Sequence, residues 1–327
     1  MRAVMTSSRV EDMKLNSHKL KQMFLDEDLI EKYKEAFEMN RDSFKGKVVL
    51  DVRCDVGLFS MMAVKAGAAK VIGVDNRSMI YETQRVIAEN NMTDKIQLIM
   101  SGIEDLRLPD GLTQVDVIIS SCFGEFPFRQ TSVQSVLLAR DKFLKPGGLM
   151  FPDTVNLYVM GIDDCGNQAE NLTFWDSLYG INMKAMAERE MRDPRLMTLN
   201  QTQLMTNQFL LQEISLYSVQ LRDVLQFKVP FQLDLNKKGY IRGVSLHHSL
   251  TFSSGTKLVK FVSGLEAPDK SWRQAVLYLR HFLICHHGDT LTGILVMRLS
   301  QIGLKIKLDV ELKGKETKII RDMDFSC

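Results

Sequence analysis

The residues best suited to chemistry in this chain follow the apolar run Val48–Leu50, at Asp51, Asp55 and Gly57. An apolar run, a short polar turn and a second apolar run predict a buried strand, a tight loop and a helix that opens at Gly57. In doubly wound α/β folds this turn binds a nucleotide, and it normally needs glycines because their backbone can approach a ligand closely. Here two of the three expected glycine positions hold Arg53 and Asp55. The turn therefore has the sequence pattern of a nucleotide-binding loop, but two side chains stand where the backbone would approach the ligand.

The elements that would position this turn alternate between strands and helices over the first half of the chain. We expect strands ending at Asp51 and over Lys70–Asp75, Ile96–Met100 and Val115–Ser120, and helices over Asp26–Phe44, Gly57–Ala66, Met79–Asn91 and Gln134–Leu144. Strands that alternate with helices in this way are typical of βαβ units around a parallel sheet.

After Phe151-Pro152-Asp153 the pattern changes. Apolar and polar residues alternate over Phe227–Leu235 and Leu304–Leu312, which predicts half-buried antiparallel strands in a sandwich or barrel. Between Asp163 and Pro194 the chain is polar and methionine-rich, apart from an apolar group formed by Phe174, Trp175, Leu178 and Tyr179. We expect these residues to share one helical face, either as a knob on a projecting arm or on an ordinary helix buried against its own domain.

Composition narrows the class of protein. The 327 residues are 45% hydrophobic and 25% charged with a net charge of +2, which argues against direct nucleic-acid binding. No apolar run approaches the roughly 20 residues of a membrane span. The five cysteines are an odd number without a CxxC pair, so we expect free thiols and a cytoplasmic location. We expect no metal site, because the pair His286-His287 lacks further ligands at useful spacing.

Several stretches together resemble one family, the protein arginine N-methyltransferases. They are Val49–Val52 with the helix after it, Ala66–Asp75, Val115–Ser120, Ala139–Gly148, Phe151–Asp153, Trp175–Gly180 and Asp309–Gly314. The resemblance implies a Rossmann-like AdoMet-methyltransferase domain followed by a β-barrel domain with an inserted helical dimerisation arm. We expect a flexible lead-in over 1–25, the first domain over 26–152 and the second over 153–327, with the arm at about 163–194.

The chain departs from the family at the positions that would carry catalysis. The resemblance implies two glutamates after the fourth strand that hold the target guanidinium, and carboxylates suit that planar fork of donors. Their places are taken by Ser121 and Gln130, and the family's pocket histidine corresponds to Ser271. Glu125 lies near the first of these places but out of register.

The cofactor residues are partly kept. By the resemblance, Asp75 matches the acid that holds the ribose hydroxyls, and Glu104 matches the acid near the adenine. Asp75 could instead cap the helix that begins near Ser78, and Glu104 could be a surface carboxylate. By the resemblance, Arg53 would project into the cofactor space and Asp55 would bring a negative charge towards the carboxylate of S-adenosyl-L-methionine (AdoMet). We therefore expect no tight cofactor binding by this chain, and AdoMet to be bound by an active partner.

These departures favour a catalytically inactive regulatory subunit, or prozyme, which is not an enzyme by itself. It would activate or stabilise an active type I protein arginine methyltransferase paralogue in a heterodimer or heterotetramer, and would meet arginine-rich substrate proteins indirectly. Phe174, Trp175, Leu178 and Tyr179 would form the partner-binding arm. One alternative is an active AdoMet-dependent methyltransferase that uses Glu125 or Asp153 in place of the missing acids. Another is a non-enzymatic scaffold for arginine-rich proteins.

Overall fold

The computed structural model describes residues 27–121, 132–166, 173–263, 273–300, 303–315 and 317–326. The chain divides into two compact units, the first made of residues 1–155, 214–221 and 250–262 and the second of 156–213, 222–249 and 263–327. None of the helices in the described ranges combines the length and the apolar character that a membrane crossing requires. The described residues also contain no group of three or more His, Cys, Asp or Glu side chains placed to hold a metal ion.

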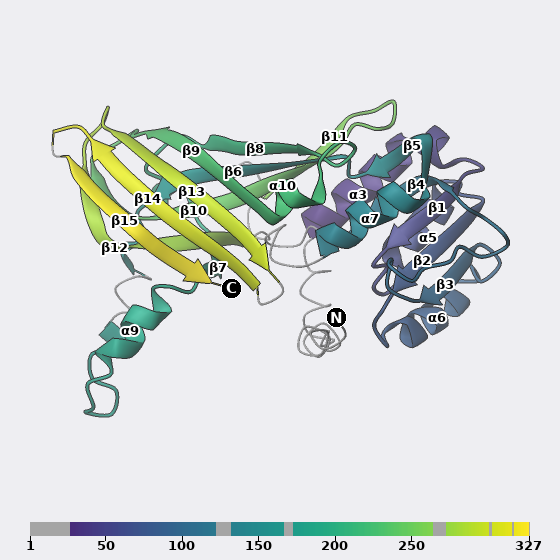
Figure 1. The fold of residues 1–327 in the computed structure, drawn as a ribbon, viewed down its shortest axis with the longest axis horizontal. Coiled ribbons are helices and arrows are strands. Elements are labelled where there is room, and N and C mark those ends of the chain that lie inside the picture. Colours follow the sequence, from purple (N-terminus) through teal and green to yellow (C-terminus); the bar gives the residue numbers. More distant parts are fainter. Residues whose placement is uncertain are drawn as a thin grey trace. The chain divides into compact units, whose positions relative to one another are not determined.

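The first unit contains a five-stranded parallel sheet (Figure 1). Its strands are β1 (Val48–Val52), β2 (Lys70–Asp75), β3 (Ile96–Met100), β4 (Val115–Ser120) and β5 (Leu144–Phe151), in the order β3-β2-β1-β4-β5. The order reverses direction between β1 and β4, and ligands of open α/β sheets bind beyond the carboxyl ends of the strands at such a point. The loops after β1, β2 and β4 are therefore the place to look for a site.

Helices pack around this sheet through buried apolar side chains. They are α3 (Glu27–Met39), α4 (Arg41–Phe44), α5 (Leu58–Lys65), α6 (Ile80–Glu89) and α7 (Ser132–Phe143). We expected one helix over 26–44, but the structure divides it at Asn40. The buried Asn40 side chain donates to the carbonyl oxygens of Ala36 and Lys257 and accepts from the Lys257 amide, so a long-range contact decides the break.

The remaining strands form two sheets. The first contains β6 (Thr154–Ile162), β7 (Arg195–Met197), β8 (Phe209–Ser215), β10 (Gly239–Phe252), β11 (Val259–Val262) and β12 (Gln274–Cys285). The second is antiparallel and contains β9 (Gln226–Asp234), β13 (Thr290–Ser300), β14 (Gly303–Lys313) and β15 (Lys318–Ser326). The alternation predicted β9 and β14, and the expected class of a Rossmann-like domain followed by a β domain is confirmed. Among the described strands the pairings give two sheets and do not close a barrel.

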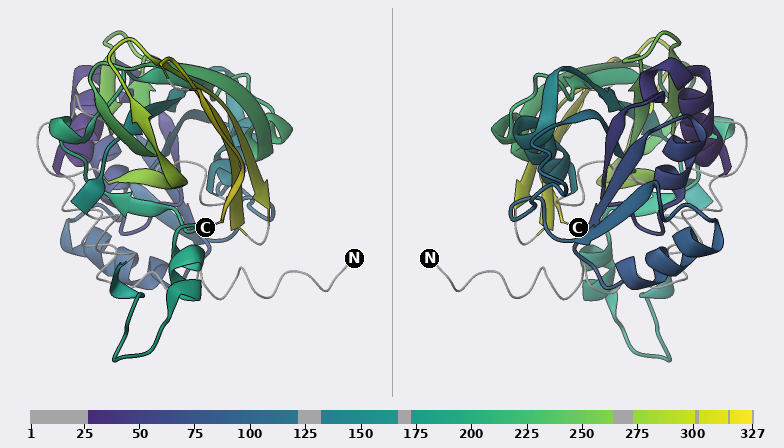
Figure 2. Two further views of the ribbon diagram at one scale, coloured as in Figure 1. Left: turned by 90° about the vertical axis from the view of Figure 1, so that its left-hand side faces the viewer. Right: turned by 90° about the vertical axis from the view of Figure 1, so that its right-hand side faces the viewer.

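Within the described ranges, these strands are connected by elements that include the short helices α9 (Lys184–Glu190) and α10 (Leu221–Leu225) and the 3-10 turn Gln201–Gln203. Residues 173–190, which end in α9, project away from the strands of the second unit as an arm (Figure 2). The arm folds as a turn and a tight hairpin, in which Leu178 and Ile181 exchange backbone hydrogen bonds of 2.9 and 3.0 Å. We had expected the four apolar residues to share one face of a helix. The structure contradicts this, because they lie on a turn and a hairpin.

Candidate functional site

Three of the residues singled out in the sequence come together at the carboxyl ends of the parallel strands. Asp75 is the last residue of β2, Asp55 lies in the loop after β1, and Ser121 follows β4. A fourth residue, Arg77, joins them, and it was missed by the sequence reasoning. Side-chain hydrogen bonds link all four in the order Ser121, Asp55, Arg77, Asp75.

Arg77 binds both oxygens of the Asp75 carboxylate. Its amide and its Nε donate to Oδ1 at 3.0 and 2.8 Å, and its Nη2 donates to Oδ2 at 2.5 Å. Bidentate pairs of this kind are among the strongest hydrogen-bonded contacts in proteins. The Arg77 side chain is 3% exposed and that of Asp75 is 0% exposed, so solvent screens the pair very little.

Asp55 completes the cluster from the loop after β1. Its carboxylate accepts hydrogen bonds from Arg77 Nη2 and, at 3.3 Å, from the Ser121 hydroxyl, while its amide donates to Asp75 Oδ2 at 3.3 Å. Two residues of the loop that are not glycine adopt a left-handed backbone, with φ of 60° at Arg53 and 49° at Asp55. Such angles are costly for residues with a Cβ, so the ion pairs and the hydrogen bond from Thr83 Oγ1 to the Asp55 carbonyl oxygen hold the loop in place.

The electrostatics of the cluster favour a permanently charged arginine. Burial by itself lowers the pKa of Arg77, but the hydrogen bonds that Arg77 donates to Asp75 and the charge of Asp55 outweigh burial and raise the pKa above its ordinary value. One guanidinium faces two carboxylates, so the three side chains together carry one net negative charge when all are ionised. The site as it stands therefore already holds a guanidinium, and that guanidinium belongs to the chain itself.

This arrangement does not fit AdoMet. An ionised carboxylate has about four lone-pair positions. Asp75 accepts from Arg77 three times and from the Asp55 amide once, so nothing is left for the ribose hydroxyls. The Asp55 carboxylate adds a negative charge on the side where the resemblance places the carboxylate of the cofactor. No reaction step through AdoMet can be derived from this conformation.

The other predicted residues lie apart from the cluster or outside the described ranges. Glu104 is exposed in the loop after β3, and its carbonyl oxygen accepts from Lys142 Nζ at 2.7 Å. Arg53 is half-buried. Gln130, Ser271 and Glu125 lie outside the described residues. Asp153 is buried and accepts from the hydroxyl of Thr154 and from the amides and hydroxyls of Ser253 and Ser254.

Asp51, on β1 beneath the loop, is a buried acid whose titration should be measurable. Ser60 Oγ donates to its Oδ2 at 2.6 Å, and Oδ1 has no hydrogen-bond partner among the described residues. Burial raises the pKa of Asp51 from its ordinary 3.8 to about 7. The folded protein therefore holds this proton more tightly than the unfolded chain does.

We expect the Asp51 contribution to stability to be present at about pH 4 and to be lost as the pH rises to about 7. The unfolding free energy of the wild type should fall relative to that of Asp51→Asn over this range, by about 1.4 kcal/mol for each pKa unit of the shift. Urea unfolding of both proteins at several pH values measures this difference, with the exposed Asp94→Asn as a control. A difference that does not change with pH would contradict the assignment.

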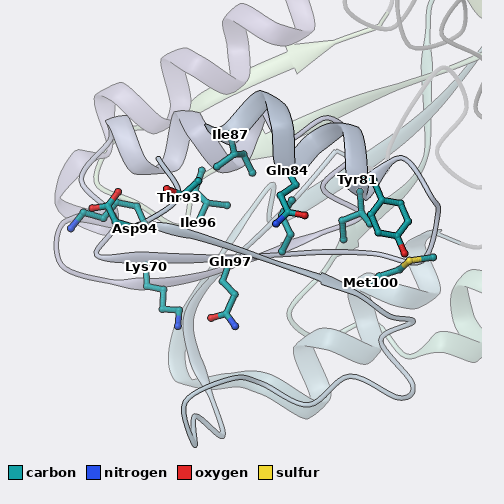
Figure 3. A pocket seen from close by; sticks show the side chains of 12 residues that line it. Lys70, Tyr81, Gln84, Ile87, Thr93, Asp94, Ile96, Gln97 and Met100 are labelled. Atoms are coloured by element: carbon teal, nitrogen blue, oxygen red, sulfur yellow. The ribbon is translucent and has the colours of Figure 1, made fainter. Parts of the chain in front are cut away.

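A hollow of about 420 Å³ lies between α6 and the edge strand β3 (Figure 3). Tyr81, Gln84 and Lys70 are among its twelve lining residues. None of the twelve is a residue that the sequence analysis proposed for a site. The hollow and the Arg77 cluster therefore have no residue in common.

The arm carries the predicted partner-binding residues with very different exposures. Tyr179, at the tip of the hairpin, is 97% exposed and Phe174 is 55% exposed, whereas Trp175 and Leu178 are half-buried. The Trp175 indole donates to Glu190, which also pairs with Arg195, and its ring meets the Phe174 ring edge to face at 5.0 Å. Trp175 therefore supports the arm, while Phe174, Tyr179 and Ile181 form its exposed apolar surface, here called the arm tip.

The sequence and the structure of this chain were compared with those of known proteins. Residues 49–148 match a methyltransferase domain, and residues 153–316 match the arginine methyltransferase oligomerization subdomain. The protein arginine N-methyltransferase 1 of Caenorhabditis elegans is 34% identical over 298 residues, covering 90% of this chain and 85% of that protein. The protein of the same name from Dictyostelium discoideum is 33% identical and covers 90% and 86%.

A solved structure of the Trypanosoma brucei PRMT1 enzyme-prozyme heterotetrameric complex with AdoHcy is similar with a TM-score of 0.89. The sequences are 31% identical, and the match covers 95% of this chain and 98% of that one. The expectation that this chain is not an enzyme by itself is wrong, because relatives that match over most of its length are named as protein arginine N-methyltransferases. The chain belongs to the protein arginine N-methyltransferase family.

Proposed function

We propose that this chain is an AdoMet-dependent protein arginine methyltransferase with unusual active-site residues, which works within an oligomer. The match of residues 49–148 to a methyltransferase domain carries the proposal. Asp75, a buried carboxylate at the carboxyl end of β2 beside the loop after β1, is the residue that would hold the cofactor once Arg77 releases it. In dinucleotide-binding α/β sheets an acid in this position binds the ribose hydroxyls of the cofactor. The matches over 49–148 and 153–316 support the reaction class.

The proposed site lacks the paired glutamates that the family resemblance implied, so other residues would have to hold the substrate. Ser121 lies within hydrogen-bond distance of Asp55, which places one hydroxyl and one carboxylate between the loops after β1 and β4. Asp153 is poorly suited to replace a missing acid. All of its hydrogen-bonding capacity is already used by Thr154, Ser253 and Ser254.

Oligomer formation is part of the proposal. The oligomerization subdomain match and the exposed arm tip support a contact with a second subunit of the same family. A hydrophobic, aromatic tip is typical of the residues that dominate the energy of an interface. The partner is either a second copy of this chain or a paralogue in a heterodimer or heterotetramer.

A second candidate function is that of a regulatory subunit that raises the activity of a paralogue. The similarity to a chain of an enzyme-prozyme complex supports it, as does the occupied Asp75 carboxylate. In that case AdoMet would be bound chiefly by the partner.

Transfer of a radiolabelled methyl group to an arginine-rich peptide separates the two. The assay compares this chain alone, a paralogue alone and the two co-expressed, at an AdoMet concentration high enough to saturate a weak site. The proposal expects label from the chain alone and a loss of that label in Asp75→Asn. Label that appears only in the mixture, at a level that Asp75→Asn leaves unchanged, would reject the main proposal in favour of the regulatory subunit.

A further inference from the structure

We infer that Arg77 is an internal latch on the cofactor site, occupying the place of the ribose hydroxyls at Asp75 and so setting the affinity of this chain for adenosine-containing ligands. The inference rests on the proposed function, because it takes Asp75 as the ribose-binding acid.

The latch has two parts with different accessibility. Its inner part is the pair between Arg77 and Asp75, which is shielded from solvent. Its outer part is the bond from Nη2 to Asp55, whose side chain is 15% exposed. A ligand that approaches from solvent therefore meets Asp55 first, and the guanidinium has to leave both carboxylates before the ligand reaches Asp75.

The hydrogen bonds of Asp75 show what an opened latch would offer. Two of its four bonds come from backbone amides, those of Arg77 and Asp55, and would remain if the arginine side chain swung outward. The other two come from Nε and Nη2, one on each carboxylate oxygen. Removal of the guanidinium thus frees one acceptor position on each oxygen, which is the number that the two hydroxyls of a ribose need.

Arg77 is also placed to move. Its backbone lies in the irregular segment between β2 and α6, outside any helix or strand. Its backbone bond to Asp75 is independent of the side-chain rotamer. The closed latch is stabilised by two carboxylates at once, so weakening either contact should favour the open form.

Calorimetry with adenosine and S-adenosylhomocysteine tests the latch. Both ligands carry the ribose, and only the second carries a carboxylate that Asp55 would repel. We expect Arg77→Ser to bind both ligands about tenfold more tightly than the wild type, or more, because the ligand no longer displaces charge-assisted hydrogen bonds. Arg85→Ser removes an exposed arginine from α6 and is expected to leave both affinities unchanged.

A double-mutant cycle shows whether Asp55 acts through Arg77. For adenosine, Asp55→Asn should give a smaller gain than Arg77→Ser, and the double variant should match Arg77→Ser, because Asp55 then has no latch to support. If the gains in binding free energy of the two single variants added in full in the double variant, Asp55 and Arg77 would not be coupled. A folded Arg77→Ser protein with wild-type affinity for adenosine would overturn the latch itself.

Circular dichroism melting establishes folding of each variant, and Arg77→Lys serves if Arg77→Ser does not fold. Lysine keeps the charge but lacks the planar fork, so a smaller gain is expected, and a folded Arg77→Lys protein with wild-type affinity would also overturn the latch. Tighter binding without methyl transfer would reject the proposed function and leave the latch standing. Methyl transfer by the wild type, with an unchanged ligand affinity in Arg77→Ser, would support the proposed function and reject the latch.

Discussion

If the arm tip is the proposed subunit contact, replacing Phe174 and Tyr179 together by alanine should weaken the association of this chain with a second subunit about a hundredfold or more. Truncation of an aromatic anchor at the centre of an interface costs about 2 kcal/mol, which is about thirtyfold in a dissociation constant. Both side chains are more than half exposed on the arm, so their loss should not disturb the folded chain. Sedimentation velocity over a range of concentrations measures the change.

The exposed Leu258→Ala is the matched control, since it removes another apolar side chain from the surface of the first unit. Trp175→Phe provides a second comparison, because it keeps an aromatic ring but loses the donor to Glu190. Trp175→Phe should lower the stability of the arm and should change the dissociation constant less than the Phe174 and Tyr179 variant does. If the Phe174 and Tyr179 variant kept the wild-type dissociation constant, the arm tip would not be the interface.

Asp153→Asn should lower the free energy of unfolding by about 3 kcal/mol, because charged hydrogen bonds in a buried network are lost and an amide group faces donors. The Asp153 carboxylate anchors the segment 253–254 to the end of β5, and its own amide donates to the Thr251 carbonyl oxygen at 2.9 Å. All of these residues belong to the first unit. Urea unfolding followed by circular dichroism gives the free energy directly.

The comparison for Asp153→Asn is Asp94→Asn, which makes the same chemical change at an exposed position and should shift the free energy by less than about 0.5 kcal/mol. A loss below about 1 kcal/mol for Asp153→Asn would mean that the network contributes little. In that event Asp153 would again be available for the substitute acid role that the sequence suggested.

The sequence pattern predicted four of the five strands of the parallel sheet. The expected strands over Lys70–Asp75, Ile96–Met100 and Val115–Ser120 coincide with β2, β3 and β4. β2 and β4 are buried, and buried parallel strands leave nearly continuous apolar runs in the sequence. β5 was missed, because Lys145-Pro146-Gly147-Gly148 resembles a helix stop followed by a turn. The break at Asn40 was missed as well, since it depends on Lys257, 217 residues away in the sequence.

The candidate site was predicted only in part, for a related reason. Asp55, Asp75 and Ser121 were identified because they stand where a cofactor-binding loop or a family residue is expected. Arg77 has no such pattern around it, and an arginine two residues after a strand is usually solvated. Its burial depends on Asp55, which comes from the preceding loop and meets Arg77 only in the folded sheet. Proximity to Asp75 in sequence was the one signal that could have drawn attention to it.

The most direct test of the central claim is whether this chain itself takes up AdoMet in its assembled state. Ultraviolet cross-linking with AdoMet labelled in the methyl group, followed by separation of the subunits on a denaturing gel, gives the answer. We expect label on this chain, more of it in Arg77→Ser and little in Asp75→Asn. Label confined to the partner subunit, with no response to either substitution, would contradict the account.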